Sequence, residues 1–106
     1  MAERANRSYS PDAPAHLHVS LSGDLDAAAA PDALARLMEA NPSPGDDVKL
    51  DLADVVFIDS VGVAMLQRAR TDLDALGCQL TFTNPSRAVV RVFTILGLLE
   101  YFSVDN

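Results

Sequence analysis

The segment from Val55 to Gly62, VVFIDSVG, constrains the fold most, because an apolar run passes directly into a polar pair that can open a helix. Four consecutive apolar residues, Val55–Ile58, are typical of a short central strand buried on both faces of a sheet. Ser60 follows, and serine is a preferred N-cap residue because its hydroxyl can accept a hydrogen bond from the first helical turn. The segment therefore predicts a strand-to-helix corner that exposes Ser60.

Apolar residues at three- and four-residue spacing predict a helix from about Val61 to Leu76, with Gly77 as its C-terminal stop. The stripe expected to face the core consists of Gly62, Leu66, Ala69, Leu73 and Leu76. At about 100° per residue, Val61 and Met65 fall roughly 80 to 120° from the centre of that stripe, so both are expected near the surface. They could form a docking patch beside Ser60, or they could be ordinary scattered apolar side chains.

Strands and helices alternate along the rest of the chain. Alternating apolar residues predict strands at His16–Ser22, Val48–Leu52 and Cys78–Thr83. Helices are expected from near Pro31 to just before Asn41, and over roughly Arg87–Leu96. This order predicts an α/β fold with a mostly parallel sheet of roughly four to five strands and helices packed mainly on one face.

The chain is expected to form one domain over residues 15–106, preceded by a flexible arm, residues 1–14, with at most a short edge strand near Tyr9. It contains no apolar run of the length that a membrane helix needs and no signal-peptide pattern, which predicts a cytoplasmic location without membrane insertion. The net charge of −7 argues against direct nucleic-acid binding and weakly favours a protein partner. The sequence indicates no particular oligomeric state.

Two acidic corners are expected at one edge of the sheet. Asp24 and Asp26, in the segment GDLD, precede the first helix, as Asp59 and Ser60 precede the second. Because sites in such folds gather at the carboxyl ends of parallel strands, the two corners are expected on the same rim. Asp24 and Asp26 could approach a metal-bound nucleotide of a partner, or could simply cap the following helix.

Enzymatic and metal-binding functions find little support in the sequence. His16 and His18 could share a metal, but no third ligand accompanies them, so solvent-facing histidines are the better interpretation. Ser60 lacks the G-x-S-x-G elbow of hydrolases, and no phosphate-binding G-x-x-x-x-G-K-[ST] loop is present. The lone Cys78 fits a buried structural thiol. We therefore expect no cofactor, and any ATP chemistry would come from a partner.

Three segments, taken in order, resemble a STAS domain, and in particular the bacterial anti-sigma factor antagonists. They are SGDLDAAAAP, DLADVVFIDSVGVAML and NPSRAVVRVFTILGLLEYF, and the likeness covers about Leu17 to Phe102. A Gly-acidic-Leu-Asp loop, a hydrophobic strand ending in Asp-Ser-x-Gly and a late Gly-Leu pair together make this resemblance fairly specific.

The resemblance implies that Ser60 is the substrate of a partner that is both a serine kinase and an anti-sigma factor. The unphosphorylated domain would bind this partner and release a sigma factor, and a phosphatase could reset the site. The partner-binding residues expected around Ser60 are Asp24, Asp26, Asp59, Val61, Gly62 and Met65. Phosphate adds about −1.5 to −2 charges, which would oppose docking of the apolar patch while leaving the domain folded.

An alternative follows from the same resemblance. Val61 stands where many family members carry a second serine. STAS domains also serve as scaffolds or regulatory subunits that dock on an ABC-transporter ATPase or within a stress-signalling complex. In that alternative the domain binds constitutively and Ser60 is only an N-cap.

Overall fold

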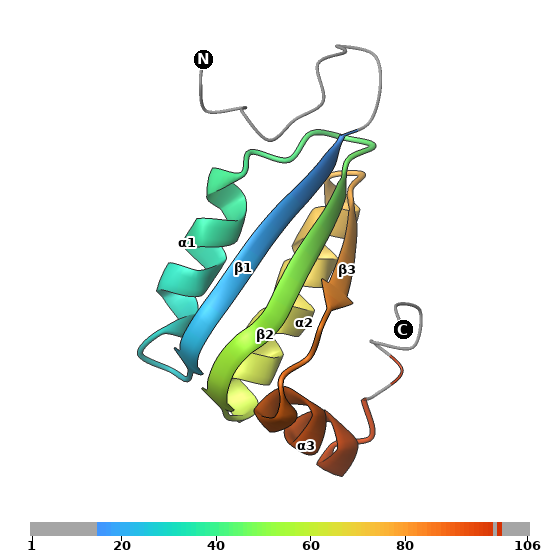
Figure 1. Ribbon diagram of the computed structural model, residues 1–106. Coiled ribbons are helices and arrows are strands. Elements are labelled where there is room, and N and C mark those ends of the chain that lie inside the picture. Colours follow the sequence, from blue (N-terminus) through green and yellow to red (C-terminus); the bar gives the residue numbers. More distant parts are fainter. Residues whose placement is uncertain (1–14, 99, 101–106) are drawn as a thin grey trace.

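The computed structural model describes residues 15–98 and 100 (Figure 1). Their elements, in chain order, are β1 His16–Leu25, α1 Ala30–Glu39, β2 Asp47–Ile58, α2 Ser60–Ala75, β3 Gln79–Thr83 and α3 Arg87–Ile95. The three strands form one parallel sheet in the order β1-β2-β3. The predicted α/β class and parallel sheet are confirmed.

The described residues supply three strands, so the expected count of four to five is not confirmed. The predicted arm over residues 1–14, with its edge strand near Tyr9, lies outside the described residues. Helix α1 contacts β1, α2 contacts all three strands, and the two helices contact each other, so both cover the same face of the sheet. Helix α3 packs against β2. None of the helices in the described part is long and apolar enough to cross a bilayer.

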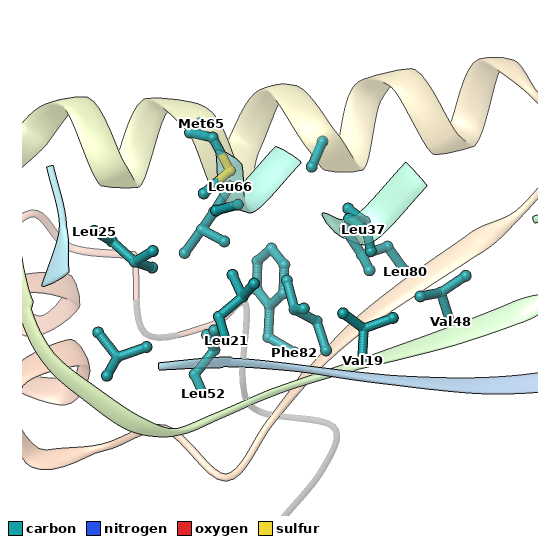
Figure 2. Close-up of a cluster of buried hydrophobic side chains, with 14 of the residues drawn as sticks. Val19, Leu21, Leu25, Leu37, Val48, Leu52, Met65, Leu66, Leu80 and Phe82 are labelled. Atoms are coloured by element: carbon teal, nitrogen blue, oxygen red, sulfur yellow. The ribbon is translucent and has the colours of Figure 1, made fainter. Parts of the chain in front are cut away.

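The core lies between the sheet and helix α2, because alternate strand residues point to opposite faces. Figure 2 shows these side chains converging from the strands onto α2 and α1. Fully or almost fully buried members include Val48, Leu50, Leu52, Leu66, Leu73, Phe82 and Leu37. Full burial of such a side chain contributes about 1.5 to 3 kcal/mol relative to exposure. This layer holds α2 against the sheet and so fixes where the helix begins.

Strand β2 differs most from the sequence prediction. The predicted strand Val48–Leu52 and the apolar run Val55–Ile58 belong to one continuous strand of 12 residues, which pairs with the 10 residues of β1. The register shifts twice, between Ser20 and Ser22 and between Gly23 and Asp24, so β2 carries two β-bulges. Each bulge opposes an extra residue of β2 to β1 and rotates the side chains that follow.

These bulges change the burial period of β2 from two to three. Leu52, Val55 and Ile58 are buried, whereas the pairs between them are exposed. Val56 is 70% exposed and Phe57 is 49% exposed. The prediction that the whole run Val55–Ile58 is buried on both faces is therefore wrong, because a bulge turns two of its four side chains outward.

Replacing the two phenylalanines by alanine tests this placement. Phe82→Ala should lower the free energy of unfolding by about 3 to 5 kcal/mol, because it opens a cavity in the core. Phe57→Ala, the matched control, should cost at most about 1 kcal/mol because its ring is half exposed. Urea unfolding measures both, and equal losses would contradict the outward position of Phe57.

Candidate functional site

The site lies at the carboxyl rim of the sheet, where β1 and β2 end side by side. Leu25 and Ile58, the last residues of these strands, are register partners. Beyond them, the Leu25 carbonyl oxygen accepts a hydrogen bond of 3.3 Å from the backbone N–H of Asp59. Figure 1 shows both strand ends and the beginning of α2 at this end of the molecule. The structure thus brings the GDLD and Asp59-Ser60 corners together.

Gly62 allows α2 to start this close to β1. A Cβ atom at Gly62 would clash with the Leu25 carbonyl oxygen and would lie 2.9 Å from Ile58 Cγ1. The clash involves backbone, so a side chain cannot be accommodated without moving the helix or the strand. Gly62 is buried and offers little surface to a partner. Its role at the site is to let the backbone of α2 lie close to that of β1.

Asp59, and not Ser60, caps α2. The Asp59 Oδ1 atom accepts hydrogen bonds of 3.0 Å from the backbone N–H groups of both Val61 and Gly62. Ser60 is the first residue of the helix, so the prediction of Ser60 as N-cap is wrong by one position. Aspartate is as good an N-cap residue as serine, and here the Asp59 carboxylate accepts the hydrogen bonds of the first turn. The Ser60 side chain is exposed, and its hydroxyl makes no hydrogen bond to residues 15–98 or 100.

The two carboxylates of GDLD have different surroundings. Asp26 is half buried, and its Oδ1 accepts a hydrogen bond of 3.0 Å from the backbone N–H of Ala29. It therefore stabilises the turn before α1, but it does not cap the helix, because the N-cap residue of α1 is Ala29, which has no side-chain cap. Asp24 is exposed on β1 as the register partner of Phe57. Both corners lie on one rim, but only Asp24 leaves its carboxylate free of hydrogen bonds to the described residues.

The expected surface patch of Val61 and Met65 is not present. Val61 is 43% exposed, but Met65 is only 8% exposed and belongs to the cluster in Figure 2. Helix α2 packs on the sheet and also on α1, which buries a wider arc of the helix than the single predicted stripe. Val61 alone is therefore available to a partner beside Ser60.

Val56 and Phe57 are exposed apolar residues close to this rim that sequence reasoning placed in the core. The available signal was the three-residue spacing of Leu52, Val55 and Ile58, which does not fit a regular strand. Such spacing is what a bulge produces.

The remaining candidates lie away from the rim. His16 is at the start of β1, where its Nδ1 lies 3.5 Å from Asp47 Oδ2, and His18 follows two residues later. Neither histidine is near the Ser60 end of the strand. Among the described residues, no group of three or more His, Cys, Asp or Glu side chains could hold a metal. Cys78 is buried, and its thiol donates to the Ser43 carbonyl oxygen at 3.1 Å.

Comparison with known proteins agrees with this geometry. Residues 11–102 match the family model described as "Mlab, STAS domain". The chain belongs to the STAS domain family. Two curated relatives of this STAS protein, the anti-sigma-B factor antagonists of Listeria monocytogenes and Listeria innocua, are each 26% identical over 91 residues. Each alignment covers 86% of this chain and 80% of the relative. The family resemblance of the sequence is thus confirmed.

The contact at Gly62 predicts whether an alanine there raises or lowers the stability of this STAS domain. In an ordinary helix interior, replacing glycine by alanine stabilises by about 1 kcal/mol. Gly62→Ala should instead destabilise the protein by about 2 kcal/mol in urea unfolding, because its Cβ clashes with the Leu25 backbone. A more stable variant would contradict the close approach of α2 to β1.

The cap assignment gives a second test. Asp59→Ala should cost about 1 kcal/mol of stability, because two N–H groups of α2 lose their acceptor. Asp59→Asn is the matched control and should lose much less, since asparagine also caps helices. Ser60→Ala should change thermal or urea stability by less than about 0.5 kcal/mol. A larger loss for Ser60→Ala than for Asp59→Ala would show that Ser60 is the cap.

Proposed function

We propose that this STAS protein is an anti-sigma factor antagonist whose partner binding is switched off by phosphorylation of Ser60. The partner is an anti-sigma factor that also has serine kinase activity, and the unphosphorylated domain binds it and releases a sigma factor. The protein itself is a regulator in the cytoplasm, not an enzyme, and needs no cofactor. A phosphatase would return Ser60 to its binding form. The names of the two Listeria relatives support the anti-sigma factor partner.

The observation that carries this proposal is that Asp59, and not Ser60, caps helix α2. Asp59 satisfies the N–H groups of the first turn, which leaves the exposed Ser60 hydroxyl without a structural task among the described residues. A kinase can therefore reach and modify Ser60 without unwinding α2. Phosphorylation of this hydroxyl would also break no hydrogen bond within the described residues.

The charge of the phosphate explains how modification switches binding. It adds about −1.5 to −2 charges beside the Asp59 carboxylate, at a helix N-terminus that favours negative charge. The fold should therefore tolerate it. A partner that covers the exposed Val61 side chain would have to desolvate the phosphate or supply a cation for it, and so would bind more weakly.

The first test is the intact mass, with site mapping, of protein purified from its native host under phosphatase inhibition, in growing and in stressed cells. A phosphate on Ser60 that changes with condition is the expected result. If an abundant protein carries no phosphate in any condition, the constitutive STAS scaffold, docked on an ABC-transporter ATPase or in a stress-signalling complex, becomes the better proposal.

Variants of Ser60 test the switch directly against the kinase identified in this way. Ser60→Ala should bind it with unchanged affinity and resist modification. Ser60→Asp should bind about tenfold more weakly or worse, a loss of about 1.4 kcal/mol, in isothermal titration calorimetry. Thr71→Asp is a control with the same charge change about three turns further along α2. Equal weakening by both aspartates would contradict a local switch at Ser60.

A further inference from the structure

Helix α3 presents a basic and apolar surface on the side that does not pack against β2. We call it the α3 outer face, and it consists of Arg87, Val90, Arg91 and Ile95. All four residues are exposed, Ile95 to 74% and Val90 to 37%. The helix lies at the carboxyl end of the sheet (Figure 1). The surface is thus positively charged, in a chain whose net charge is −7.

Helical spacing gathers these four residues on one side of α3. At about 100° per residue, the two arginines lie one turn apart, and the two apolar residues flank them on either side. The opposite side of the helix carries Val89 and Phe93, which are both fully buried. The buried side therefore holds α3 on the domain, while the outer face stays open to solvent.

Neither arginine is neutralised within the described part of the protein. Arg87 and Arg91 form no ion pair or hydrogen bond through their side chains with any other described residue. The 9 residues of α3 include no acid that could pair with them. By contrast, Arg68 on α2 pairs with Asp72 at 3.3 Å. The two positive charges of the outer face are therefore available to a ligand.

The positions of these arginines are unfavourable for the helix itself. Arg87 is the first residue of α3, where the helix dipole disfavours a positive charge. Arg91 lies four residues further along, and like charges at this spacing repel each other on a helix. The fold does not account for the two charges, whereas a negatively charged ligand between them would offset both effects.

We propose that the α3 outer face binds an acidic amphipathic helix of a partner protein. Arginine binds carboxylates through paired hydrogen bonds, and carboxylates four residues apart on a helix have the same axial spacing of about 6 Å as the two arginines. Val90 and Ile95 would cover apolar side chains of that helix.

Other anionic partners fit this surface less well. Two arginines are too few for a nucleic-acid backbone or an anionic membrane, which both need larger basic clusters. The surface includes neither Ser60 nor a carboxylate of the rim. The proposal therefore goes beyond the proposed function and does not depend on it.

The test is an NMR titration of the full chain with a peptide of four Leu-Glu-Ala-Ala repeats, which carries glutamates four residues apart. The comparison peptide has lysine in place of glutamate. We expect saturable shifts of the Arg87 and Arg91 Nε–H and Ile95 methyl resonances with the glutamate peptide. The lysine peptide should leave these resonances unchanged, although the net charge of −7 attracts it.

Arg91→Gln should weaken binding of the glutamate peptide about two- to fivefold, because one exposed ion pair is lost. Arg68→Gln, the matched control, removes the same charge from an exposed position on α2 and should leave the affinity within error. Equal effects of the two variants would overturn the proposal, because the attraction would then be general.

Two further outcomes would overturn the proposal. One is the absence of shifts at Ile95. The other is self-association of the unmodified chain, seen by sedimentation velocity and abolished by Arg91→Gln, because a second copy would then occupy the α3 outer face. None of these outcomes bears on the modification of Ser60, which the mass measurement decides separately.

Discussion

The arrangement of the rim depends on the close approach of helix α2 to the Leu25 carbonyl oxygen. That oxygen accepts the Asp59 N–H and lies where a side chain at position 62 would have to be. The contact joins the end of β1 to the beginning of α2, although Asp59 lies 34 positions after Leu25 in the sequence. It brings the two acidic corners of the rim together, so glycine at this position is a requirement of backbone packing.

The bulges of β2 are the second constraint, because they decide what the rim exposes. A regular strand would have buried alternate residues up to Ile58 and would have placed Val56 in the core. With two extra residues, β2 keeps Leu52, Val55 and Ile58 inside and turns Val56 and Phe57 outward. Bulges occur often beside functional sites because they redirect side chains without ending the strand. Here they add Val56 and Phe57 to the apolar surface of the rim, to which the helix side contributes Val61 but not the buried Met65.

The sequence was sufficient for what depends on periodicity and insufficient for what depends on tertiary contacts. Alternation along β1 and β3, Pro31 at the expected start of one helix and Gly77 as the stop of the next predicted the order of elements, and family motifs led to Ser60. Periodicity could not show that Met65 would be buried, since the buried arc of α2 depends on two neighbours, the sheet and α1. Nor could it decide between Asp59 and Ser60 as the cap, because both residue types cap helices and only the backbone conformation separates them.

A surface switch requires that the modified group contribute little to the fold, and the rim satisfies this condition. The side chains that hold α2 to the sheet, including Leu66 and Leu73, are fully buried and lie beyond the first turn. Asp59 stabilises that turn, while the Ser60 hydroxyl bonds to none of the described residues. A phosphate on Ser60 would therefore alter the electrostatics of the rim far more than the stability of the domain.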